Sequence, residues 1–186
     1  MSFNNDLNII IEEISNAIKK IDQNQISILV NKIKESKRVF VSGKGRSGLM
    51  IASFANRLMH LGFDVHIVGD LTTPHTDPQD LLILSSGSGE TSSIIELAKI
   101  ANKNKVFVAL ITTNNNSTVA KQSQIIVNLP GPSKKTERNN SVSTIQPMGS
   151  LFEQLSLLVY DSIILQLMRD LGETSDTMLL RHANLE

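Results

Sequence analysis

The sequence contains no cysteine, and this absence excludes disulfide bonds and thiolate chemistry. It also contains no tryptophan and one tyrosine, which argues against a site that stacks aromatic rings on nucleic-acid bases. Neither sign of charge is in excess, because 18 basic residues balance 18 acidic residues. A net charge of zero argues against nucleic acid or an anionic membrane as the main partner.

Signals for export and for membrane insertion are also missing from the sequence. Residues 1–6 lack the basic start of a secretion signal, and no apolar run approaches the length that spans a bilayer. We therefore expect a cytoplasmic protein without a membrane partner. The length of 186 residues suits one domain with a sizeable core.

Short apolar runs alternate with amphipathic stretches in the middle of the chain. The apolar runs predict strands at 38–41, 63–68, 80–84, 106–111 and 125–129. Two helices are expected before them, at 4–20 and about 24–35, and a long apolar helix follows at 149–171. This alternation is typical of an α/β fold, with a parallel sheet covered by helices on both faces. Segment 130–147 is expected to be a mobile loop over the top of the sheet.

The stretch 85–93 joins a predicted strand to a predicted helix. Its two glycines, Gly87 and Gly89, let the backbone approach a ligand and adopt positive φ. Its hydroxyl groups and the free N–H groups at the helix start favour an anion. We therefore predict a phosphate site that includes Ser86, Ser88 and Thr91. The simpler interpretation is a Gly/Ser loop with a capping side chain.

A second glycine loop lies upstream, at 43–48, also between a strand and a helix. Its spelling is Gly-x-Gly-x-x-Gly, and Asp70 follows at about the 20-residue offset at which an acidic residue holds a ribose. Taken alone, this pattern predicts a dinucleotide site. Arg46 and Ser47 make the loop equally suited to a sugar phosphate, so both interpretations stay open.

Glu153 lies in the first turn of the long C-terminal helix, among apolar residues. One interpretation is a capping box, in which Ser150 and Glu153 cap each other's backbone amides, and spacing alone favours it. The other interpretation is a general base. An apolar setting raises the pKa of a carboxyl and a helix N-terminus lowers it, so the sequence does not decide between them.

Two histidines are further candidates for acid–base chemistry. His60 falls near the end of the helix that starts at the first glycine loop, where the helix dipole favours a histidine in any case. His182 lies in the C-terminal tail, where a solvated histidine is the ordinary interpretation. No histidine or carboxylate has a metal-ligand spacing, and we expect no metal.

Five segments together resemble one family over nearly the whole chain. They are Gly-Lys-Gly-Arg-Ser-Gly at 43–48, Arg-Leu-Met-His-Leu-Gly at 57–62, Ser-Gly-Ser-Gly-Glu-Thr at 86–91, Pro-Met-Gly-Ser-Leu-Phe-Glu at 147–153 and Arg-His-Ala-Asn-Leu-Glu at 181–186. The third is shared by the sugar isomerase (SIS) domain family. The second and the last narrow the resemblance to the 6-phospho-3-hexuloisomerases of the ribulose monophosphate pathway.

The resemblance implies a five-stranded parallel sheet flanked by helices, a flavodoxin-like three-layer sandwich. It implies a single SIS domain over 1–186, with N-terminal helices at 1–36, a phosphate-binding core at 37–130, and a C-terminal helix with a site-forming tail at 148–186. Relatives of this kind assemble as dimers or tetramers, with sites at subunit interfaces. We therefore expect a homo-oligomer, and a homotetramer in particular.

The resemblance also implies a reaction, the interconversion of D-arabino-3-hexulose 6-phosphate and D-fructose 6-phosphate through a cis-enediol, without metal or redox cofactor. Glu153 is implied as the base, and His60, from a neighbouring chain, as its acid–base partner. His182 is a third candidate. Arg46 and Gly45 are implied to contact the substrate, Arg46 at the enediolate or at the phosphate. The phosphate is implied to lie on Ser47, Ser86, Gly87, Ser88, Gly89 and Thr91.

Three other functions remain as alternatives. The chain could be a non-catalytic sugar-phosphate sensor, although no attached DNA-binding region is evident and Glu153 is present. It could be another phosphosugar aldose–ketose isomerase. A nicotinamide-dependent oxidoreductase would explain the first glycine loop but leaves the serine-rich loop at 85–93 without a role.

Overall fold

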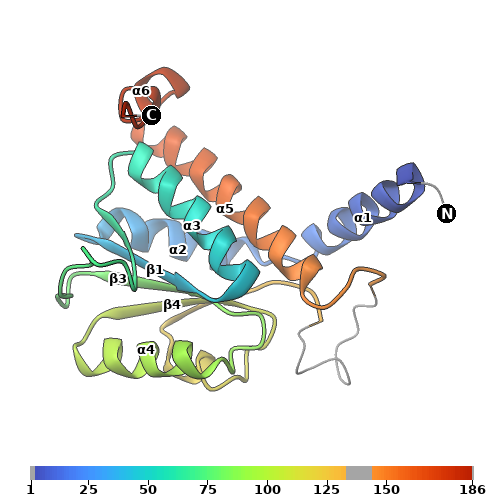
Figure 1. The fold of residues 1–186 in the computed structure, drawn as a ribbon, viewed down its shortest axis with the longest axis horizontal. Coiled ribbons are helices and arrows are strands. Elements are labelled where there is room, and N and C mark those ends of the chain that lie inside the picture. Colours follow the sequence, from blue (N-terminus) through green and yellow to red (C-terminus); the bar gives the residue numbers. More distant parts are fainter. Residues whose placement is uncertain (1–2, 133–143, 186) are drawn as a thin grey trace.

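The computed structural model describes residues 3–132 and 144–185. Its five strands form one parallel sheet with the order β2-β1-β3-β4-β5, which confirms the predicted α/β class (Figure 1). The strand order reverses direction once, next to β1, as in flavodoxin-like sheets. The strands are β1 Val39–Gly43, β2 Val65–Ile67, β3 Leu81–Ser85, β4 Phe107–Thr112 and β5 Ile125–Asn128.

Helices connect and flank these strands. The predicted helices all form, with ends that differ from the expected ones by a few residues, and a single 3₁₀ turn, η1, precedes β5. One more short helix, α6, forms in the tail, where the sequence predicted none. The helices are α1 Phe3–Ile18, α2 Gln23–Glu35, α3 Gly45–His60, α4 Ser92–Lys103, η1 Ala120–Gln122, α5 Ser150–Leu171 and α6 Ser175–Leu179.

The two faces of the sheet carry separate apolar layers, because side chains alternate along each strand. Val39 and Val41 of β1 pack with α2, α3 and α5 in the larger layer. Phe40, between them, packs with α4 and η1 in the smaller layer on the other face. Figure 1 shows the resulting three layers, with α3 and α5 above the sheet and α4 below it.

The register of the central strands brings the two glycine loops to the same level. Gly43 at the end of β1 lies opposite Ser85 at the end of β3, and Ser85 lies opposite Ile111 of β4. Both loops therefore leave the carboxyl edge of the sheet side by side. Parallel sheets of this kind bind ligands at that edge.

The amino edge of the sheet holds a cluster of ion pairs. Arg38, just before β1, donates from Nε and Nη2 to the two carboxylate oxygens of Asp80, at 3.1 and 2.8 Å. Asp80 is fully buried, and Asp77 joins the cluster at 3.0 Å from the same guanidinium. A buried carboxylate needs such a partner, so Arg38 ties the start of β1 to the start of β3.

Helix α5 corrects one expectation from the sequence. By length and composition this 22-residue helix is apolar enough to cross a membrane, although no run of that length was expected. Half of its most apolar stretch is buried inside the protein. Its buried residues include Leu155, Ile163 and Leu167, which belong to the larger apolar layer. A core helix of a globular protein passes the same test, so this is weak evidence for a membrane span.

The loop predicted over the top of the sheet lies largely outside the described residues, in 133–143. Its C-terminal end is fixed to α1 by a single carboxylate. Glu13 accepts hydrogen bonds from the Thr144 hydroxyl, from the Ile145 amide at 2.8 Å and from the Gln146 side chain at 2.9 Å. Helix α1 therefore anchors the segment that leads into α5.

Candidate active site

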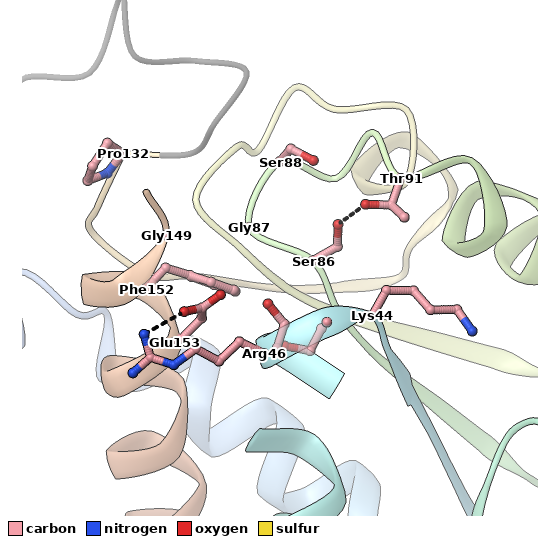
Figure 2. A pocket seen from close by; sticks show the side chains of 13 residues that line it. Lys44, Arg46, Ser86, Gly87, Ser88, Thr91, Pro132, Gly149, Phe152 and Glu153 are labelled. Atoms are coloured by element: carbon pink, nitrogen blue, oxygen red, sulfur yellow. Dashed lines mark hydrogen bonds and ion pairs between the residues drawn. The ribbon is translucent and has the colours of Figure 1, made fainter. Parts of the chain in front are cut away.

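The two glycine loops and the first turn of α5 enclose a cavity of about 210 Å³ at the carboxyl edge of the sheet. Figure 2 shows Glu153 and Arg46 on one side of this cavity, with Ser86, Ser88 and Thr91 on the other. Most of the residues predicted for the site line it. The lining consists of Lys44, Gly45, Arg46, Ser47, Ser85, Ser86, Gly87, Ser88, Thr91, Pro132, Gly149, Phe152 and Glu153.

The loop after β3 turns its hydroxyl groups and amides toward one point. The Ser86 hydroxyl accepts from the Gly89 amide at 3.2 Å and lies 3.4 Å from the Thr91 hydroxyl. The Ser88 hydroxyl accepts from the Glu90 amide at 3.2 Å. Thr91 is the N-cap residue of α4, and its side chain makes no capping hydrogen bond. Its hydroxyl is thus available at a helix N-terminus, where an anion is favoured.

Close packing requires glycine at two positions of this loop. Gly89 has φ +62°, and a Cβ there would lie 2.0 Å from the Ser117 hydroxyl oxygen. Gly89 is not among the residues that line the cavity, so its contribution is to set the course of the loop. A Cβ at Gly87 would lie 3.1 Å from the Phe152 ring, so this glycine lets the ring of α5 pack against the loop.

The first glycine loop is equally tight, because a Cβ on Gly48 would lie 2.8 Å from the Gly43 carbonyl oxygen. The ribose-binding acid of a dinucleotide site is not brought to this loop, however. Asp70 lines a different cavity, between α3 and the end of β2, together with His66 and Thr73. The geometry therefore disfavours the dinucleotide interpretation and leaves the first loop facing the serine-rich one.

The first turn of α5 does not form the capping box that spacing alone favoured. Gly149 is the N-cap residue, and no side chain caps this helix end. The Ser150 hydroxyl instead accepts a hydrogen bond from Nη1 of Arg46 at 2.9 Å. The same nitrogen lies 3.2 Å from Oε2 of Glu153, so the carboxylate and the guanidinium form an ion pair on one wall of the cavity (Figure 2). Glu153 is thereby held with its side chain 16% exposed.

His60 lies at the other end of α3 from this cavity. Helix α3 starts at Gly45 and ends at His60, so at 1.5 Å per residue its two ends are about 22 Å apart. His60 is buried, although the sequence placed it on the polar side of its helix. It does not meet Glu153 within one chain.

His182 meets His60 at this distal end. The two rings stack with their centroids 5.2 Å apart, and Arg181 fixes the tail by donating to the His60 carbonyl at 3.0 Å. Burial, the Arg57 charge and His182 together lower the pKa of His60, which favours the neutral imidazole at neutral pH. Both histidines line a third cavity of about 420 Å³, which Asp161 also lines.

Several lining residues were not predicted from the sequence. Gly149 and Phe152 belong to the quoted motif at 147–153, so that motif offered a signal for them. Lys44 points away from Glu153 in Figure 2. Ser85 ends a strand that reads as apolar, and its buried hydroxyl has no hydrogen-bond partner among the described residues. Nothing in the local sequence marks Ser85 as a residue that lines the cavity.

Comparison with known proteins agrees with this geometry. The SIS domain family model matches residues 32–158, which include both glycine loops and Glu153. The chain belongs to the SIS family. A protein from Methanococcus jannaschii, whose crystal structure was described as implying a 3-hexulose-6-phosphate isomerase, superimposes with a TM-score of 0.83 at 33% identity, over 97% of this chain and 98% of that one.

Two curated relatives match over most of their length. A 3-hexulose-6-phosphate isomerase from Bacillus subtilis is 48% identical over 177 residues, which covers 95% of each chain. A 3-hexulose-6-phosphate isomerase from Mycobacterium gastri is 38% identical over 182 residues, covering 98% of this chain and 90% of the relative. Both matches cover more of the chain than the family model does.

Proposed function

We propose that this protein is an isomerase that interconverts D-arabino-3-hexulose 6-phosphate and D-fructose 6-phosphate, as in the ribulose monophosphate pathway. The observation that carries the proposal is a carboxylate facing a phosphate-type loop across one small cavity, in a chain 48% identical to a 3-hexulose-6-phosphate isomerase. A phosphorylated sugar fits a cytoplasmic place of action, in agreement with the cysteine-free sequence.

The binding step uses the two glycine loops. Ser47, Ser86, Ser88 and Thr91 surround the position where the phosphate would lie, and the start of α4 adds favourable dipoles. The phosphate is remote from the reacting carbons. The binding energy of the phosphate therefore orients C2 and C3 toward Glu153, and this orientation raises the rate of the chemical step.

The chemical step is a proton transfer between adjacent carbons. From the fructose side, Glu153 takes the proton from C3, and the C2 carbonyl oxygen gains a proton as the enediol forms. The proton on the C3 oxygen is then lost, C3 becomes the carbonyl, and Glu153 returns its proton to C2. One carboxylate serves both carbon positions, and Arg46 faces the charge that develops on the enediolate oxygens.

The oxygen-to-oxygen proton transfer needs a second group, and we assign it to His60 of a neighbouring subunit. Two observations support an assembly with shared sites. His60 lies about 22 Å from the cavity of its own chain by helix length. Apolar residues are exposed along α1, which extends away from the sheet in Figure 1, including Phe3, Leu7 and Ile11. We propose a homotetramer in which neighbouring chains complete each site.

Hydrogen exchange read by NMR tests the reaction directly. Fructose 6-phosphate is incubated with the enzyme in heavy water, and deuterium is located at C1 or C3. We expect deuterium at C3 together with signals of the 3-ketose. Deuterium at C1 alone would indicate an aldose–ketose isomerase, and binding without incorporation would indicate a sensor.

Glu153→Gln tests the base, because the amide keeps the shape of the side chain but cannot accept the proton. We expect loss of turnover with retained binding of fructose 6-phosphate. A near-normal rate in this variant would remove Glu153 from the mechanism. Calorimetric titration of both proteins separates lost chemistry from lost binding.

The shared site is tested by mixing two inactive variants in one assembly. Subunits carrying Glu153→Gln and subunits carrying His60→Asn are co-expressed with different affinity tags and purified through both. A site built from two chains recovers activity in the mixed oligomer, because some sites receive an intact Glu153 and an intact His60. Sites confined to single chains would leave the mixed oligomer inactive.

A further inference from the structure

The two carboxylate oxygens of Glu153 have different surroundings. Oε2 lies 3.2 Å from Nη1 of Arg46. Oε1 makes no hydrogen bond within the described part of the chain and faces Gly149, where an added Cβ would lie 3.5 Å from it. Oε2 is thus held by the Arg46 guanidinium, whereas Oε1 has no such partner and lies beside Gly149.

Ser150 is the residue that fixes this arrangement. Arg46 is about half exposed, with 48% of its side chain accessible, and an exposed guanidinium on a long side chain does not hold one position without further contacts. The Ser150 hydroxyl is largely buried at the first turn of α5 and accepts from the same Nη1 at 2.9 Å. Its position follows from the helix backbone, so it gives the guanidinium a rigid anchor.

We propose that Ser150 is a positioning residue. By holding Arg46 on Oε2 of Glu153 it leaves Oε1 as the oxygen that moves the proton. A carboxylate with one oxygen fixed presents the other in a constant direction to C2 and C3, and small errors of direction are costly in rate. The inference rests on the proposed isomerase function and assigns roles within the same site.

Ser150→Ala removes the anchor without disturbing the helix cap, which is provided by Gly149. We expect kcat to fall by about tenfold, the effect of a weakened hydrogen bond to a charged group, while the KM for the sugar phosphate changes less than twofold. Ser150→Thr keeps the hydroxyl and should restore most of the rate. Ser156→Ala is the matched control, because Ser156 is also a buried serine of α5 but its hydroxyl donates to the Phe152 carbonyl at 2.8 Å.

A double-mutant cycle shows whether Ser150 acts through Arg46. In the Arg46→Ala background, Ser150→Ala should cause little further loss, because the group it positions is gone. Equal losses in both backgrounds, or the same loss in Ser156→Ala, would overturn the proposal. An unchanged kcat in Ser150→Ala would do the same.

Gly149→Ala tests the assignment of Oε1. The new methyl group meets Oε1 at an ordinary contact distance, and the backbone there needs no positive φ. We therefore expect unchanged thermal stability but a kcat reduced severalfold, since the methyl group occupies space in front of the reacting oxygen. Normal turnover in this variant would show that Oε1 does not carry the proton.

A readout without turnover keeps this inference separate from the proposed function. Rotation about the Nε–Cζ bond of Arg46 is measured by ¹⁵N NMR, with Arg46→Ala for assignment. Slow rotation in the wild type and faster rotation in Ser150→Ala supports the anchor, even if the wild type proves inactive on both sugars. Equal rotation in the two proteins refutes the anchor whatever the enzyme's activity.

Discussion

Two glycines with nearly the same positive φ allow the cost of packing in the serine-rich loop to be measured. Gly89 has φ +62° and Gly172, at the C-terminal end of α5, has φ +69°. A Cβ at Gly89 would lie 2.0 Å from Oγ and 2.4 Å from Cβ of Ser117, whereas nothing lies within 4 Å of a Cβ at Gly172. The two alanine variants therefore share the cost of a left-handed residue and differ in the steric cost.

The expected losses of unfolding free energy follow from two costs, that of the left-handed backbone and that of the steric clash. A left-handed alanine costs about 1–2 kcal/mol, part of which is offset because alanine also restricts the unfolded chain. Gly172→Ala should thus lose about 1 kcal/mol. Gly89→Ala should lose a further 1–3 kcal/mol or so, the usual cost of overpacking, because Ser117 is buried and must shift. For a chain of this length each kcal/mol lowers the Tm by about 2–4 °C.

Urea unfolding of both variants at one fixed protein concentration provides the assay, with the wild type as reference. Fixed concentration matters because assembly contributes to apparent stability. We also expect Gly89→Ala, but not Gly172→Ala, to raise the KM for the sugar phosphate. Equal stability losses in the two variants would refute the reasoning, because Ser117 would then move away from the added methyl group without a loss of stability.

Three further predictions concern single side chains. Ser88→Ala should raise the KM for the sugar phosphate about tenfold by removing one phosphate contact, and an unchanged KM in steady-state kinetics would exclude that contact. Tyr160→Phe should leave the unfolding free energy unchanged or raise it by up to about 1 kcal/mol, because the buried hydroxyl neighbours Ser85 but lies outside hydrogen-bond geometry; a clear loss in denaturant titration would show that the two hydroxyls are bonded. Burial alone would raise the pKa of Glu13, but its hydrogen bonds from Thr144, Gln146 and the Ile145 amide lower it below its ordinary value of 4.5. That stabilisation is complete above pH 4.5 and is lost as the pH falls through the lowered pKa, so melting curves of Glu13→Gln should show a weaker acid dependence than those of the wild type.

The parallel sheet was predictable because its signals are local. Unbroken apolar runs such as 81–84 and 106–111 can be buried on both faces only in such a sheet, and the helices between them have clear apolar periodicity. The short α6 was missed, since a five-residue helix capped by Thr174 has little periodicity to detect. The division of the chain into a single domain over 1–186 stays a prediction.

The candidate site was predictable in its residue types but not in its pairings. The glycine loops at 43–48 and 85–93 follow strands, and parallel topology brings them together. The pairing of Ser150 and Glu153 with Arg46 joins residues more than 100 positions apart, so the local spacing at 150–153 suggested a capping box instead. The roles of these residues in binding and catalysis stay predictions until the experiments above are made.

The ion-pair cluster at the amino edge of the sheet lies apart from the candidate site, so stability and substrate choice can change independently there. Arg38 and Asp80 lie at the opposite ends of β1 and β3 from the two glycine loops, one strand length away. Replacing this buried pair with apolar residues of similar volume can stabilise a protein. Heat tolerance should therefore be adjustable there, by selection or by protein engineering, without changing the sugar that the enzyme accepts.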